Sequence, residues 1–230
     1  MQDIIFSIQS IFFLSLFTIV FGYVMDFTVC RDSLEYYCKN NLDLYIKGIV
    51  SSLVNLLIVS PINYLIITIV SKPFVLFCSG LQILNLFMIL VTHNILYFIF
   101  HFMVHKISFL RFIHEFHHKF KRNLPSIANS VSIYEFQIMY VTPFLVGFYL
   151  FQPNLYTFNV SIFIISFLNI IIHCNELSNL KWSKLLVSPN DHKDHHLKFS
   201  TSFAAPLLNF DNILSTYIKI QRKIVRKYAE

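Results

Sequence analysis

Charged residues make up only 13% of the 230-residue sequence, whereas 56% of its residues are hydrophobic. Soluble domains usually contain about 25% charged residues, so this shortage excludes the ordinary soluble class. Gly/Ser/Pro-rich linkers, long charge runs and internal repeats are also missing, which excludes a multidomain or repeat architecture. The composition therefore predicts an integral membrane protein with one domain.

Several chemical motifs are missing as well. The four cysteines form no C-x-x-C pair, which argues against a zinc knuckle or a dithiol redox centre, and we expect free thiols. Without a Gly-rich dinucleotide fingerprint or a haem domain, electrons for redox chemistry must come from another protein. No nucleic-acid-binding motif accompanies the net charge of +6, so we expect no nucleic-acid partner and interpret the charge as attraction to anionic lipid.

Three uncharged runs are long enough to cross a hydrocarbon core of about 30 Å. They comprise residues 4–24, 48–70 and 74–100. The first has no basic start and no small-residue cleavage site, so we expect a retained span rather than a signal peptide. Pro61 should kink the second run. The short turn at residues 71–73 predicts that the second and third runs form a hairpin.

A fourth apolar region, residues 136–172, is interrupted at residues 152–154. Each half is marginal in length for a membrane crossing. Whether the two halves cross the membrane or only dip into it, they form a helical hairpin that brings His173 back to the same side of the membrane as His118. Most basic residues lie on that side, and the positive-inside rule makes it cytoplasmic, with the N-terminus outside. These residues are Lys106, Arg111, Lys119, Lys121, Arg122, Lys181, Lys184, Lys193, Lys198, Lys219, Arg222, Lys223, Arg226 and Lys227.

Histidines are concentrated in two short stretches, "HFMVHKISFLRFIHEFHHKF" and "DHKDHHLKF". On a helix the first pair would share one face, and one helical turn would aim each later trio at a single point. With His173 the set exceeds what one metal ion binds, so the sequence predicts two ions with open positions. Imidazole suits iron, zinc, copper and nickel alike. The candidate ligands are His101, His105, His114, His117, His118, His173, His192, His195 and His196.

Less specific interpretations apply to some of these residues. His93, alone within a span, is expected to be structural. The acidic residues Asp191, Asp194, Glu115 and Glu176 are close enough in sequence to orient histidines, and equally suited to being exposed charges. A metal buffer or transporter would need ion-passing histidines or carboxylates within the spans, and apart from His93 the predicted spans contain none.

The motifs "HFMVH", "HEFHH" and "HKDHH" resemble the three histidine boxes of the fatty acid hydroxylase/sterol desaturase superfamily of membrane di-iron oxygenases, over residues 92–216. Within the superfamily the sequence is most similar to the cholesterol 25-hydroxylase and C4-methyl sterol oxidase families. The likeness rests on "SIYE" and on "HLKFSTSFAAPLLNFDNILST". The matching positions in the latter are Phe199, Phe203, Ala204, Asp211, Ile213, Leu214 and Thr216.

The resemblance implies two Fe ions held by the nine histidines, O2 as co-substrate, and attack on a C–H bond of a sterol or fatty acyl lipid. No catalytic residue apart from the metal ligands is implied. Electrons would come from NAD(P)H through a separate reductase and a b-type cytochrome, for which the basic face at Lys119, Lys121 and Arg122 is a candidate docking surface. Contact of that face with lipid headgroups is an equal alternative. The same di-iron site would also serve a desaturase.

Four positions depart from the family pattern. Asn94 replaces an aspartate, Phe210 a tryptophan and Ser215 a glycine, and Trp182 only partly matches an expected proline-tryptophan step. None of them removes a predicted metal ligand. We therefore expect these departures to affect which substrate is used more than whether the protein is active.

The predicted architecture is an all-α integral membrane protein with about three spans, an apolar helical hairpin and a cytoplasmic helical cap that holds the histidine-rich dimetal site. Residues 1–91 would form the N-terminal transmembrane helices, residues 92–216 the catalytic region and residues 217–230 a basic tail. We expect the endoplasmic reticulum in a eukaryote and the inner membrane in a bacterium. Since coordinating imidazoles must be neutral, activity should fall below about pH 6.

Overall fold

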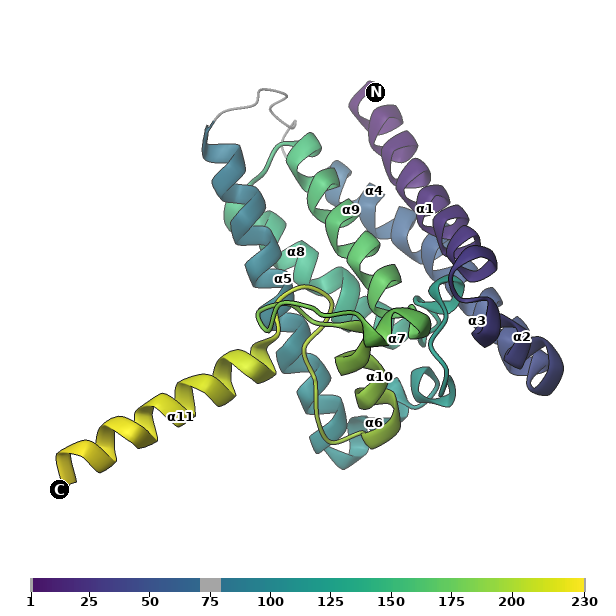
Figure 1. Cartoon of the computed structure of the whole chain (residues 1–230). Coiled ribbons are helices and arrows are strands. Elements are labelled where there is room, and N and C mark those ends of the chain that lie inside the picture. Colours follow the sequence, from purple (N-terminus) through teal and green to yellow (C-terminus); the bar gives the residue numbers. More distant parts are fainter. Residues whose placement is uncertain (1, 71–79, 230) are drawn as a thin grey trace.

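The computed structural model describes residues 2–70 and 80–229, and within them it is built from helices, with no strand beyond one isolated β-bridge. This confirms the all-α prediction (Figure 1). The longer helices are α1 (Gln2–Thr28), α3 (Leu42–Val54), α4 (Ser60–Val70), α5 (Gly80–Lys106), α8 (Thr142–Phe151), α9 (Leu155–Ile172) and α11 (Phe210–Ala229). The shorter ones are α2 (Arg31–Asn40), α6 (Arg111–His114), α7 (Ile133–Glu135) and α10 (Pro189–Lys198).

Among the residues that the structure describes, five helical segments are long and apolar enough to cross a bilayer. They are Ile5–Thr28, Leu42–Ile69, Leu81–Lys106, Ile133–Phe151 and Leu155–Ile172. They correspond to the three predicted spans and to the two halves of the predicted hairpin, each of which is long enough on its own. Their outer faces carry exposed apolar side chains such as Phe13 and Ile83, which favour lipid over water. The chain is therefore an integral membrane protein.

The second span is locally irregular where a kink was expected. A π-helical turn, η1 (Asn55–Val59), precedes Pro61, and the Ser60 backbone N–H donates to the Asn55 carbonyl. Proline has no N–H to give to the carbonyl four residues earlier, and a π turn is one way to accommodate that loss. The predicted turn at residues 71–73 lies outside the described residues. Instead of packing chiefly on each other, α4 packs mainly against α1, and α5 mainly against α8 and α9.

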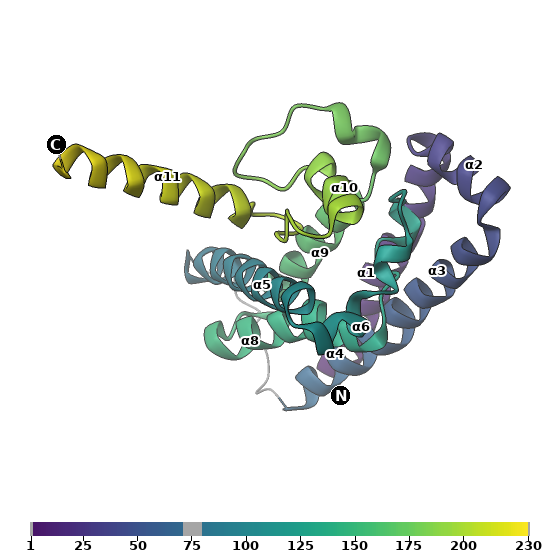
Figure 2. The same cartoon turned by 90° about the horizontal axis from the view of Figure 1, so that it is seen from below.

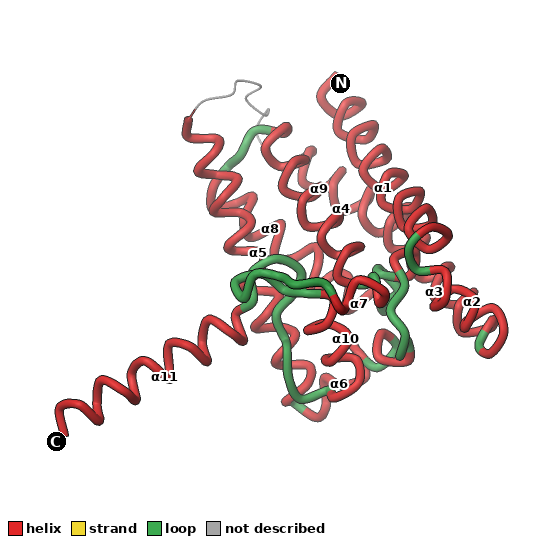
Figure 3. The backbone as a smooth tube through the Cα atoms, in the orientation of Figure 1, coloured by secondary structure: helices red, strands yellow, loops and turns green. Residues whose placement is uncertain are grey.

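Irregular chain gathers at one end of this bundle, beyond the cytoplasmic ends predicted for the spans (Figure 3). There α6 and α10 lie close to the ends of α5 and α9, while α11 extends away from the body (Figures 1 and 2). The loop before α7 is tied to the bundle, since the Asn55 side chain donates to the carbonyls of Asn129 and Val131, both at 3.0 Å. These backbone carbonyls of the loop thus have hydrogen-bond donors near the apolar region.

Candidate metal centre

The nine predicted histidines come together at this end of the bundle in two groups. We call them the five-histidine group (His101, His105, His114, His118 and His195) and the four-histidine group (His117, His173, His192 and His196). Within each group the candidate ligand nitrogens all lie within 4.8 Å of one another. His93 belongs to neither group and packs its ring against Phe144, at a centroid distance of 4.4 Å. Every histidine predicted as a ligand is therefore placed where it can act as one.

The prediction that each trio aims at a single point is wrong. The trio beginning at His114 is divided because the chain there is not one helix: α6 ends at His114, and His117 begins a separate 3-10 turn, η3 (His117–Lys119). The second trio does lie on one helix, α10, but that helix runs between the groups. His192 and His196, one turn apart, belong to the four-histidine group, and His195 belongs to the other.

Hydrogen bonds fix the imidazole tautomers. The Nδ1 atom of His101 lies 2.7 Å from the Phe203 carbonyl oxygen, that of His195 lies 2.8 Å from the Thr201 carbonyl, and that of His173 lies 2.7 Å from the Asn169 carbonyl. A carbonyl oxygen only accepts, so each Nδ1 carries the proton and donates it. In a neutral imidazole the Nε2 atom then presents a lone pair, which is the form that binds a metal ion.

The Nε2 atoms face each other at short range. Those of His101 and His114 are 2.9 Å apart, and those of His173 and His192 are 3.0 Å apart. When Glu135 is ionised, both rings donate their Nδ1 proton elsewhere, and the Nε2 lone pairs of His101 and His114 then repel unless a cation lies between them. With metal–nitrogen bonds of about 2.1 Å, two imidazoles at right angles place their nitrogens about 3 Å apart. The donor set and its spacing therefore fit two metal ions, one for each group.

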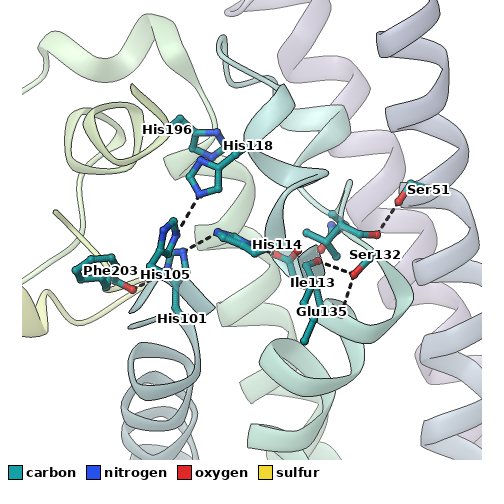
Figure 4. A network of polar contacts seen from close by, with 12 residues as sticks. Ser51, His101, His105, Ile113, His114, His118, Ser132, Glu135, His196 and Phe203 are labelled. Atoms are coloured by element: carbon teal, nitrogen blue, oxygen red, sulfur yellow. Dashed lines mark hydrogen bonds and ion pairs between the residues drawn. The ribbon is translucent and has the colours of Figure 1, made fainter. Parts of the chain in front are cut away.

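Glu135 is the carboxylate that orients a histidine, and it was absent from the predicted candidates. Its Oε1 atom accepts from His114 Nδ1 at 2.7 Å, in a fully buried pair (Figure 4). Ser132 caps the short helix α7 by accepting from the Glu135 N–H at 3.1 Å, and it donates to the Ile113 carbonyl at 2.7 Å. The "SIYE" match was the available signal, because it spans both residues.

The four carboxylates that were predicted to orient histidines contact other groups instead. Asp191 completes a capping box with Ser188 at the start of α10, and Asp194 pairs with Lys198 at 2.7 Å. Glu115 lies 4.0 Å from Lys119 on the surface. The remaining candidate, Glu176, accepts from the Ser33 N–H. None of these carboxylates has a described hydrogen bond to a histidine, and backbone carbonyls take that role instead.

Burial keeps these imidazoles neutral. It lowers the pKa of His173 and of His195 to about 4, although each Nδ1 hydrogen bond to a carbonyl opposes the shift. For His192 and His196 burial comes first and the charges of neighbouring histidines second, and together they hold the pKa well below its usual value. Neutral imidazoles are the ligand form, so the site binds cations without first losing protons at neutral pH.

The loop that follows the last box is held in place by Asn94 of α5 and by Asp211. The Asn94 side-chain oxygen accepts from the N–H groups of Leu207 and Leu208, both at 3.1 Å. Asp211 accepts from the Ala204 N–H at 2.8 Å. These contacts fix the loop whose Phe203 carbonyl orients His101. An amide at position 94 supplies the same acceptor as the family's aspartate, so this departure preserves the loop.

Comparison with known families agrees with this geometry. The family model for fatty acid hydroxylase matches residues 85–216, more than half of the chain and all nine histidines. The chain belongs to the fatty acid hydroxylase family. No curated protein and no solved structure matches it. Membership, the apolar spans and the histidine groups together support a membrane oxidoreductase of the lipid hydroxylase or desaturase type.

Two openings flank the histidines of this family member. On the cap side, a cavity of about 470 Å³ is lined by His105, His114, His118 and Phe199 and is bordered by Lys106, Arg111 and Glu115. On the membrane side, a mainly apolar cleft lies among the spans. Its lining includes Tyr64, Phe158, Phe144, Tyr140, Asn129 and Asn169. The histidines thus lie between a cavity with charged residues in its lining and a mainly apolar cleft.

Proposed function

We propose that this protein is a di-iron, O2-dependent hydroxylase that oxidises a C–H bond of a sterol or fatty acyl lipid. The observation that carries the proposal is the convergence of nine histidines, in two groups, near an apolar cleft among membrane spans. An apolar cleft admits a lipid tail, and its dryness protects an oxidising centre from side reactions. The five-histidine group would hold one iron ion and the four-histidine group the other. When bound, the irons supply O2 activation and C–H oxidation.

The cleft reaches the histidines through a pair of buried tyrosines. Tyr140 lines the cleft and packs edge-on against Tyr97, with ring centroids 5.6 Å apart. Tyr97 in turn packs against His101 at 5.3 Å. On the other side, Asn169 lines the cleft while its carbonyl orients His173. A lipid in the cleft would therefore be separated from His101 by the two tyrosines and from His173 by Asn169, and these side chains would position its reacting carbon and exclude water.

A sterol substrate is supported by the likeness of "SIYE" and of the Phe203–Asp211 ending to the cholesterol 25-hydroxylase family. Both motifs have a structural counterpart here, because Glu135 orients His114 and Asp211 fixes the loop that orients His101. A desaturase using the same site is the second candidate. It would differ only in whether the substrate loses a second hydrogen or gains oxygen.

Electrons would enter from the cap side. The Phe199 ring lies 4.5 Å from the His118 ring, and the Lys121 ammonium lies 4.1 Å from the Phe199 centroid. Phe199 therefore connects an exposed basic surface to the five-histidine group. An acidic b-type cytochrome, which receives its electrons from an NAD(P)H reductase, would dock on this basic surface. The basic residues also favour a cytoplasmic cap, in the endoplasmic reticulum of a eukaryote or the inner membrane of a bacterium.

The test is mass spectrometry of lipids and sterols from a sterol-producing host that expresses the protein with a cytochrome and its reductase. Wild type is compared with His117→Ala and His195→Ala, one variant for each group, and with His93→Leu, the one histidine outside both groups. A lipid that gains one oxygen only with wild type and His93→Leu supports the hydroxylase. A lipid that loses two hydrogens selects the desaturase, and identical profiles in all four strains contradict both.

A further inference from the structure

A second kind of ligand cluster lies where α1 and α9 end, outside the histidine groups. Cys30 follows α1, Cys174 follows α9, and Glu176 lies in the 3-10 turn η6 (Asn175–Asn179). Their sulfur and carboxylate atoms all lie within 4.8 Å of one another, and both cysteines are fully buried. Residues 144 positions apart in the sequence, at 30 and 174, are thus brought together with a carboxylate.

Only one of the two carboxylate oxygens of Glu176 has a hydrogen-bond partner among the described residues. The Ser33 backbone N–H donates to Glu176 Oε1 at 3.0 Å, and the Asn175 side chain donates to the Ser33 hydroxyl at 3.5 Å. Glu176 Oε2 is buried and has no hydrogen-bond partner among the described residues. A buried, unpartnered carboxylate oxygen beside two thiols lacks the compensation that such groups normally have.

The surroundings add negative rather than positive charge. Asp26 is buried nearby, close enough for the charge of Glu176 to act on it. None of the ion pairs formed by described residues includes Asp26 or Glu176. Two buried thiols, the buried Asp26 and the half-buried Glu176, none of them in a described ion pair, form an environment that favours a cation.

We propose that Cys30, Cys174 and Glu176 bind a zinc ion, separate from the irons of the proposed function. Two thiolates and one carboxylate are zinc ligands, and a water molecule would complete a tetrahedron. On binding, both thiols lose their protons to solvent and no electrons are transferred. The ion would fasten the end of α1 to the chain that follows His173, and so hold one wall of the four-histidine group in place.

Cobalt(II) distinguishes this site from the histidine groups, because thiolate ligands give an intense near-ultraviolet charge-transfer band that imidazoles do not. The full-length protein, purified in detergent under reducing conditions, is titrated with cobalt in a Cys38→Ser/Cys78→Ser background that leaves only the two clustered cysteines. We expect the final intensity of the band to correspond to one thiolate-bound cobalt per chain in this background and in wild type, while cobalt in the histidine groups adds nothing to it. It should disappear in Cys30→Ser and persist in His195→Ala. Absence of the band from wild type would overturn the proposal.

A second measurement uses the unmutated protein and so does not depend on how well a variant folds. Zinc should slow alkylation of Cys30 and Cys174 at least tenfold while leaving the exposed Cys38 unchanged, as read by mass spectrometry of the peptides. Equal alkylation with and without zinc would contradict the site. Loss of two thiols without any metal would identify a disulfide instead. Either result leaves the lipid oxidation test of the proposed function unaffected.

Discussion

The two histidine groups use the same ligand type in different surroundings. In the four-histidine group every ring is buried, whereas the five-histidine group includes the half-buried His105 and borders the cap-side cavity with Phe199 and basic residues. The five-histidine group also contains His114, the one imidazole with a hydrogen bond to a carboxylate among the described residues. Under the proposed function, the five-histidine group beside the cavity would receive the electrons, whereas the four-histidine group is enclosed by protein.

Removing a ligand from either group should have the largest effect. His114→Ala and His192→Ala are each expected to lose one metal ion per chain and at least about 100-fold in turnover, since a ligand matters more than its orienting partner. Metal analysis and product formation measure both quantities. Insertion into the membrane should be unchanged, and a variant that keeps two ions would remove its histidine from the ligand set.

Substitutions of Glu135 should have a smaller effect, and one that is limited to the five-histidine group. Glu135→Leu removes the acceptor that orients His114 and should reduce turnover or metal affinity about 10- to 100-fold. Glu135→Gln retains an acceptor and should lose less. The loss is expected only in the five-histidine group, as followed by metal titration. Equal weakening of both groups would mean that Glu135 supports the whole fold.

Acidification should destabilise the metal-free protein. The pKa of His173 and of His195 is about 4 in the folded protein, against about 6.5 in an unfolded chain. Between these values the unfolded chain binds protons that the folded protein does not, so stability falls as pH drops from about 6.5 to about 4. Thermal unfolding across this range measures the change, and a constant Tm would contradict it. The same shifts move the expected loss of activity from about pH 6 toward pH 4.

The smallest effect should come from the proposed electron entry. Phe199→Ala removes the ring between Lys121 and His118 and should slow reduction by a cytochrome several-fold, while reduction by a small chemical reductant stays the same. Lys121→Glu should lower the salt dependence of the cytochrome reaction. Phe109→Ala, at another exposed phenylalanine near the cap, is the matched control. Equal slowing with both reductants would place Phe199 in a structural role.

Spacing and hydropathy predicted the nine histidines that the structure brings together at one end of the bundle, and the apolar segments that it forms into helices. They were not sufficient to assign histidines to ions, because that depends on α6 ending at His114 and on α10 running between the groups. Nor did proximity in sequence find Glu135, which is 21 residues from His114 and reaches it through the fold. Sequence neighbours such as Asp191 instead serve their own helix.

The central claim is that two inequivalent iron sites are built from five and from four imidazoles. Mössbauer spectroscopy of the protein loaded with ⁵⁷Fe(II) under anaerobic conditions tests it most directly. We predict two ferrous doublets of equal area at two irons per chain, with one doublet lost in His192→Ala and the other in His114→Ala. A single iron per chain, or one doublet that both variants weaken equally, would contradict the account.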